Sequence, residues 1–269
     1  MLQREPPPAL RPFVRTLWAG EPVAGGPAFR ERVLPTGRMH LVFRSSAHPL
    51  RILDDPQDRR VNSFGHAIVG GARAGAYLRE VFPGGASVGA ELHAGACMAL
   101  FGLPADVLAE RHTPLEDLWR VEAMHACDRI FSARGAVAQL DAFADILAAR
   151  LPHVHGLHPA VAAALAGFRE SRDVQAMVAA SGYSHRHFIA VFERETGLTP
   201  KRFCRVQRFR KLLADAATHP ALSWTNLALA HGYSDPQSHF NREFRAFAGI
   251  TPGEYRRAAP RYPHHVAPA

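Results

Sequence analysis

The sequence has little cysteine and no long apolar run. Its three cysteines, Cys97, Cys127 and Cys204, are far apart and form no CxxC pair, which argues against a disulfide framework and a cysteine zinc site. The longest apolar run, residues 94–105, is too short for a membrane helix and contains a proline. The first residues lack the apolar segment of a secretory signal. We therefore expect a cytoplasmic protein without a membrane partner.

Motifs of catalysis and of metal binding are also lacking. The sequence has no G-x-S-x-G elbow, no phosphate loop and no paired-carboxylate pattern. Two groups of histidines are candidate metal ligands: His153, His155 and His158, and His40, His66 and His93. The first group lies in a segment with Pro and Gly and no acidic residue, which favours a solvated hinge, and the second contains no HxH pair. We expect no catalytic site, no metal and no cofactor, and Cys97 fits a core residue better than a thiol sensor.

The positive charge of the chain is unevenly distributed. The net charge is +8, with 47% hydrophobic and 21% charged residues, as in a globular protein. Residues 1–157 carry 17 Lys and Arg against 16 Asp and Glu, whereas residues 158–269 carry 15 against 8. Almost all of the excess therefore lies in the last 112 residues, where it would suit a polyanionic partner.

That basic region contains two copies of one sequence pattern. The first copy has Gly-Tyr-Ser at 182–184, followed by Phe188, Phe192, Gly197 and Thr199-Pro200; the second has Gly-Tyr-Ser at 232–234, followed by Phe240, Phe244, Gly249 and Thr251-Pro252. From the phenylalanines onward the two copies are 52 positions apart. Each copy predicts a short apolar helix, a glycine turn, a serine cap (Ser184 or Ser234) and a second helix with its phenylalanines on one face. This is a helix-turn-helix, present in tandem.

These residues resemble the tandem helix-turn-helix domain of AraC/XylS-type transcription regulators. The resemblance covers about the last 110 residues and implies seven helices in two homeodomain-like units that bind double-stranded DNA. Residues 34–43, 103–105 and 114–118 resemble, more loosely, the AraC-associated sensor domains. That likeness implies a regulatory N-terminal domain, with a small-molecule effector, RNA polymerase and a second copy of the chain as candidate further partners.

The N-terminal half predicts a small β domain followed by helices. Strands are expected at 13–18, 31–35, 38–44, 61–69, 76–82 and 87–93, with a loop at 54–58, which suggests a small antiparallel barrel or sandwich. Helices are expected at 97–102, 105–111, 115–131 and 137–151. The apolar stripe Leu140, Phe143, Ile146 and Leu147 favours packing on the β domain over dimerisation.

The expected fold class is therefore α+β with two domains. We predict a regulatory domain at 1–152, a linker at 153–158, the DNA-binding domain at 159–260 and a tail at 261–269. The helix from Pro200 to about Ala217 would space the two units.

The predicted DNA contacts come from the two second helices and the spacer helix. They are Arg186, His187, Ile189, Arg194, Arg202, Arg205, Gln237, Ser238, Asn241, Arg242 and Arg245. Arginine pairs with guanine and asparagine with adenine, so the second unit has the better base-reading chemistry. Its start is two residues longer than in the first unit, which leaves the register of Gln237 and Ser238 open. The basic residues of the spacer helix divide between phosphate contacts and ion pairs with Glu193, Glu195 or Asp215.

Two other functions fit parts of the sequence. One is an enzyme, or a metal-binding cupin-like domain, fused to a DNA-binding domain. The other is an architectural protein that binds DNA without sequence preference.

Overall fold

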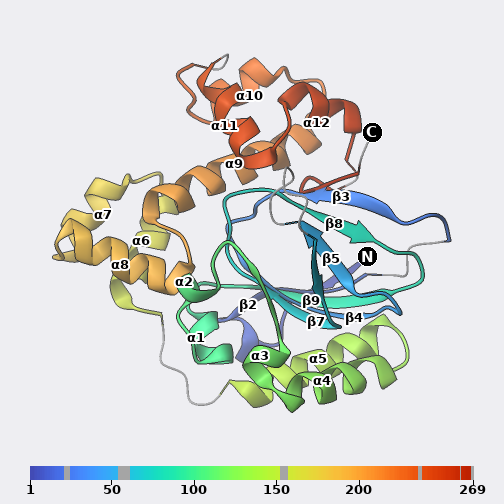
Figure 1. Cartoon of the computed structure of the whole chain (residues 1–269). Coiled ribbons are helices and arrows are strands. Elements are labelled where there is room, and N and C mark those ends of the chain that lie inside the picture. The colour runs from blue at the N-terminus through green and yellow to red at the C-terminus, as the bar shows by residue number, and fades with distance from the viewer. Residues whose placement is uncertain (21–24, 54–60, 152–156, 236–237, 261, 268–269) are drawn as a thin grey trace.

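The N-terminal half is a β-sandwich of two antiparallel sheets (Figure 1). The computed structural model describes residues 1–20, 25–53, 61–151, 157–235, 238–260 and 262–267. The larger sheet has the order β1 (Leu2–Arg4), β2 (Val14–Gly20), β9 (Ala86–Leu92), β4 (Met39–Ser45), β7 (Ala67–Gly70) and β10 (His112–Pro114). The smaller has the order β11 (His265–Val266), β3 (Phe29–Val33), β8 (Tyr77–Val81), β5 (Leu50–Leu53) and β6 (Asn62–Phe64).

The main core lies between the larger sheet and the helices, not between the two sheets. Along β4 alternate side chains are buried, and Phe43 packs against Phe143, with ring centroids 5.4 Å apart. Val42 points to the other face, where it joins a small cluster with Ile52 and Ile68. This alternation follows from the two-residue period of a strand, and both faces of β4 are covered by apolar side chains.

Five helices follow the sandwich and cover this sheet: α1 (Ala96–Phe101), α2 (Ala105–Leu108), α3 (Glu116–Trp119), α4 (Val121–Ser132) and α5 (Ala136–Arg150). The stripe of α5 is buried against β2 and β9 and against α1 and α4, so its packing within the domain is confirmed. The single helix predicted at 115–131 is interrupted at Arg120, whose φ of 53° lies in the left-handed region.

Four strands were not predicted from the sequence: β1, β5, β10 and β11. Each has only two to four residues, too few to display an alternation of its own. The predicted strand at 61–69 is two strands, β6 and β7. The predicted loop at 54–58 falls outside the described residues.

The last strand, β11, follows the helices of the C-terminal half yet belongs to the N-terminal sandwich. His265 and Val266 pair with Val33 and Arg32 of β3. Part of the segment predicted as a tail therefore closes the edge of the smaller sheet. Figure 1 shows the chain returning to β3 after the last helix.

The C-terminal half contains, in its described part, the seven helices predicted. They are α6 (Pro159–Arg169), α7 (Val174–Ser181), α8 (His185–Thr196), α9 (Pro200–Thr218), α10 (Trp224–Ala230), α11 (His239–Ala248) and α12 (Pro252–Ala258). Helix α9 carries α6 to α8 at one end and α10 to α12 at the other (Figure 1). Of the helices described, none is both long and apolar enough to cross a bilayer.

Candidate nucleic-acid interface

The first helix-turn-helix unit has the predicted local geometry. Gly182, which ends α7, has a φ of 69°, in the left-handed region that glycine adopts without strain. The Ser184 hydroxyl accepts a hydrogen bond from the His187 amide (3.3 Å) and so caps α8. Phe188 and Phe192 are buried on the inner face. The cap and the buried phenylalanines together determine which face of α8 points to solvent.

The predicted reading positions of α8 differ in exposure. Arg186 and His187, in its first turn, are exposed, as is Arg194 in its last turn. Ile189 is half-buried. The exposed part of this helix is therefore basic at both ends, with an apolar position between them.

The second unit begins differently because of its two extra residues. Ser234 does not cap α11, so that prediction is wrong: the helix starts at His239, after Ser238. The Asp235 carboxylate accepts hydrogen bonds from the Ser238 amide (2.8 Å) and from the Ser238 hydroxyl. Asp235 thus binds Ser238, the residue that precedes α11, and the helix has no side-chain cap of the kind that Ser184 gives α8. Gln237 lies outside the described residues.

The outer face of α11 presents the predicted polar side chains. Phe240, Phe244 and Phe247 are buried, whereas Ser238, Asn241, Arg242 and Arg245 are exposed. Arg242 also lines a groove of about 760 Å³ between the two units, together with Arg172 and Lys201. Both recognition helices therefore present basic side chains to solvent.

Helices α9 and α11 are joined by a buried carboxylate. Glu243 is 2% exposed and accepts hydrogen bonds from Tyr233 Oη (2.7 Å), Arg205 Nε (2.7 Å) and Arg208 Nη2 (2.8 Å). Burial raises the pKa of Glu243, but the hydrogen bonds from Tyr233 and the two arginines outweigh it, so this pKa lies below its ordinary value. The corresponding position in the first unit, 52 residues earlier, is Val191. The network belongs to the second unit alone.

The basic residues of α9 have other partners than those predicted. Arg205 and Arg208 pair with Glu243, and Arg202 Nη2 lies 2.9 Å from Glu110 Oε1 of the N-terminal domain. The expected pairing of these arginines with Glu193, Glu195 or Asp215 is therefore replaced, and Asp215 pairs instead with His231 (2.9 Å). Two of the predicted phosphate contacts, Arg202 and Arg205, are thus held by carboxylates in this conformation.

The DNA-binding half rests directly on the sandwich. Gln207 Nε2 on α9 donates to the Thr36 carbonyl oxygen (3.1 Å), and Arg32 Nη1 donates to the carbonyl oxygen of Ala248 (3.4 Å). At the end of α8, a Cβ added to Gly197 would lie 3.2 Å from the carbonyl oxygen of Ala105 in α2. Both units therefore contact the N-terminal domain.

The remaining candidates from the sequence are Cys97 and two groups of histidines. Burial raises the pKa of Cys97 to about 12, with smaller contributions from Asp106 and Glu195, and its side chain is 2% exposed, as expected of a core residue. No cluster of three or more metal-ligating side chains occurs in the part of the chain that the structure describes. His153 and His155 fall outside that part.

Comparison with known proteins assigns the C-terminal region. A family of helix-turn-helix domains matches residues 177–258, which run from within α7 to the end of α12. The chain carries an AraC-type helix-turn-helix DNA-binding domain. Residues 2–114, in front of this AraC-type domain, match a domain of unknown function, DUF6597. No curated protein matches the chain.

The solved structures similar to the chain include several of ToxT from Vibrio cholerae. A single-residue variant of ToxT in its apo form has 7% sequence identity and a TM-score of 0.47, over 96% of this chain and 100% of that one. ToxT bound to an unsaturated fatty acid has 8% identity and a TM-score of 0.46, over 89% and 94%. Similarities this low say nothing about a DNA target or a ligand of this chain.

Proposed function

We propose that the protein is a sequence-specific transcription regulator whose two units enter adjacent major grooves on one face of the duplex. The observation that carries this proposal is the pair of exposed basic recognition helices, α8 and α11, on units joined by a single helix. Helix α9 has 19 residues and is about 28 Å long at 1.5 Å per residue. Successive major grooves are about 34 Å apart. The spacer is thus of the right order to place both helices.

In this proposal the first unit positions the protein and the second specifies the sequence. Helix α11 presents Asn241, Arg242 and Arg245, whose side chains match the hydrogen-bonding edges of adenine and guanine. Helix α8 presents Arg186 and Arg194, which suit phosphates, around the half-buried Ile189, which suits a thymine methyl. Binding would be driven by phosphate contacts and would weaken as salt concentration rises.

The decisive experiment is selection of bound DNA from a random pool by the full-length protein and by Arg242→Ala. We expect two boxes about one helical turn apart, with the variant losing information in one box and about 1–3 kcal/mol of binding free energy. Arg202→Ala is the matched control, because a phosphate contact weakens binding to all sequences alike. An equal, sequence-independent loss in both variants would refute this division of roles. Binding without any motif would favour the architectural alternative.

The N-terminal domain would modulate this binding through its contacts with both units. A ligand changes DNA affinity only if it binds one arrangement of the two domains better than another. The contacts of Thr36, Arg32 and Glu110 with the DNA-binding half are the elements that such a ligand would strengthen or weaken. RNA polymerase and a second copy of the chain are the macromolecular partners that a regulator of this kind would meet.

A further inference from the structure

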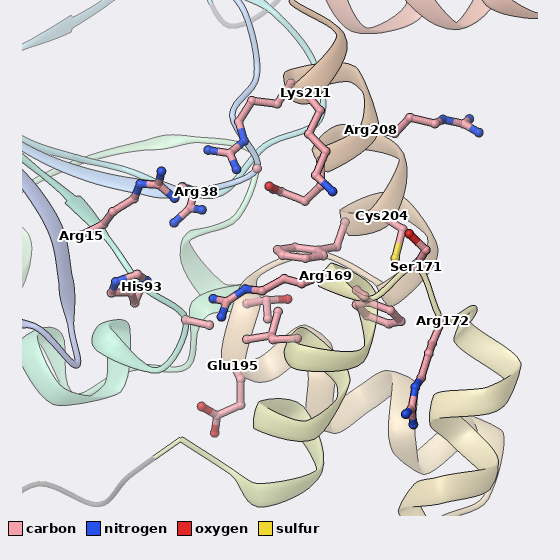
Figure 2. A pocket seen from close by; sticks show the side chains of 18 of the residues that line it. Arg15, Arg38, His93, Arg169, Ser171, Arg172, Glu195, Cys204, Arg208 and Lys211 are labelled. Atoms are coloured by element: carbon pink, nitrogen blue, oxygen red, sulfur yellow. The ribbon is translucent and has the colours of Figure 1, made fainter. Parts of the chain in front are cut away.

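A pocket of about 710 Å³ lies between the two domains. The N-terminal domain contributes Arg15, Arg38 and His93, and the DNA-binding domain contributes side chains of α6, α8 and α9. Figure 2 shows Arg15 and Arg38 entering the space from one side and Arg169 from the other, while Arg172 and Arg208 point away from it. The pocket exists only because the two domains are in contact.

Four of the arginines that line this space lie near one carboxylate, that of Glu91, which pairs with two of them. We call Arg15, Arg38, Arg169 and Arg210 the arginine cluster. Glu91 Oε1 lies 2.7 Å from Arg38 Nε and 3.8 Å from Arg15 Nε. Arg169 and Arg210 form no ion pair among the described residues. Glu195 also lines the pocket, but its side chain points away from the labelled arginines (Figure 2). The cluster therefore has an excess of about three positive charges.

These guanidinium groups are close enough to perturb one another. Burial lowers the pKa of Arg38 to about 10; Glu91 opposes this shift, while Arg210, Arg15 and Arg169 add to it. Arg210 Nε is buried and has no hydrogen-bond partner among the described residues. Burial and the charge of Arg38 and Arg15 also lower the pKa of His93, which keeps that imidazole neutral at pH 7. Confined like charges with unused donors form a site that an anion would stabilise.

Part of the pocket lining is apolar. Leu165 and Phe168 of α6 and Phe203 of α9 contribute this part, and the rings of Phe168 and Phe203 have centroids 6.4 Å apart. All three side chains are only partly buried. A ligand that fits both the arginine cluster and the apolar part of the lining has an anionic head group and an apolar body.

We propose that this pocket binds a phosphate monoester with an apolar or aromatic body. A monocarboxylate would neutralise only one of about three excess charges, whereas a phosphate monoester carries nearly two at neutral pH and offers three oxygens to the guanidinium forks. Because Arg15 and Arg38 belong to one domain and Arg169 and Arg210 to the other, the bound phosphate would cross-link the domains. Its effect on DNA binding rests on the proposed function, whereas the binding itself does not.

The test uses 1-naphthyl phosphate and the full-length protein in isothermal titration calorimetry at pH 7.5 and fixed ionic strength. We expect one site per chain, and at least tenfold weaker binding of 1-naphthoate, which keeps the aromatic body but has one charge, and of inorganic phosphate, which lacks the body. Arg210→Gln and Arg169→Gln should each weaken binding of 1-naphthyl phosphate about tenfold or more. Arg134→Gln removes the same charge at an exposed position outside the pocket and should leave affinity within about twofold.

Three results would overturn the proposal: no binding of 1-naphthyl phosphate at millimolar concentration, equal affinity for 1-naphthoate, or equal losses in Arg134→Gln and Arg210→Gln. Arg169 is exposed and has no ion pair among the described residues, so its variant should fold even if Arg210→Gln does not. Failure of the DNA selection would leave these titrations unchanged, which separates the ligand proposal from the regulator proposal.

Discussion

Replacing Glu243 by glutamine should destabilise the second DNA-binding unit. The substitution keeps the size of the side chain but removes its charge and turns one acceptor oxygen into a donor. Tyr233, Arg205 and Arg208 then compete for one oxygen. Hydrogen bonds to a charged group are worth about 1.5–3 kcal/mol each. The arginine side chains are 39% and 29% exposed, so water replaces part of the loss. We expect a net cost of about 2–3 kcal/mol.

The cost should be measured by thermal unfolding and located by hydrogen exchange. A loss of this size lowers Tm by about 5–10 °C in a chain of this length. Protection should fall first in α9 and α11, which Glu243 joins, and not in α7 and α8. Glu170→Gln is the matched control, because Glu170 is 64% exposed and, among the described residues, its ion pair is with Arg172 at 3.4 Å. Its Tm should stay within about 2 °C, as a surface pair contributes about 1 kcal/mol or less.

The stabilisation by Glu243 should depend on pH in a defined direction. A carboxyl whose pKa is lower in the folded state stabilises the fold above its ordinary pKa, and this contribution disappears as the pH falls through the folded value. The Tm difference between wild type and Glu243→Gln should therefore shrink steadily below pH 4.5, the ordinary value. A difference that is absent at pH 7, or that grows on acidification, would refute the assignment of Glu243 as the ionised centre of the network.

Two further substitutions test the contacts between the domains. Gly37→Ala places a Cβ 3.0 Å from Val206 Cγ1 and puts alanine at a φ of 69°. The substitution should therefore lower the free energy of unfolding by about 1–3 kcal/mol and raise hydrogen exchange in α9 near Val206. Unchanged exchange there would contradict the contact. Glu110→Gln should release Arg202, while the amide oxygen of the new side chain still accepts a hydrogen bond from the Ala74 amide. DNA affinity, measured by fluorescence anisotropy, should then rise severalfold. An unchanged affinity would mean that the ion pair does not compete with DNA.

The tandem units could be predicted because their signals are local. A glycine with positive φ, a serine cap and phenylalanines four residues apart each act within one or two turns of helix, and Gly182, Ser184, Phe188 and Phe192 play their predicted roles. In the second unit, the same local signals did not predict how the second helix begins. With two extra residues, Ser234 does not cap α11, and Asp235 binds Ser238 instead, which depends on the conformation of the turn rather than on any pattern.

The interdomain features could not be predicted because they join residues far apart in the chain. Nothing around Arg202 indicates that Glu110 holds it, and nothing around Arg210 indicates that it meets Arg15 and Arg38. Strand β11 has only two residues, and its pairing with β3 depends on where α12 ends. Two sequence signals were nevertheless available: the Thr36-Gly37 turn, which contacts α9, and the excess of arginine in the C-terminal half.

The two units are tied to the N-terminal domain by different means, and this asymmetry shows how regulation could work. The first unit rests on α2 through Gly197, and its connection to α9 is held by the pair of Arg202 with Glu110. The second is anchored through the Ala248 carbonyl and through the strand that follows α12. Glu31 holds that strand through hydrogen bonds with His265 and Arg79. Burial raises the pKa of Glu31, but these hydrogen bonds lower it to about 2, so the Glu31 carboxylate stays charged at neutral pH. If either attachment opened, that unit would be free of the N-terminal domain while α9, one continuous helix, still joined it to the other unit. A ligand in the arginine cluster would act on the attachment of α6 and α9, and so on the freedom of both units to match the spacing of two grooves.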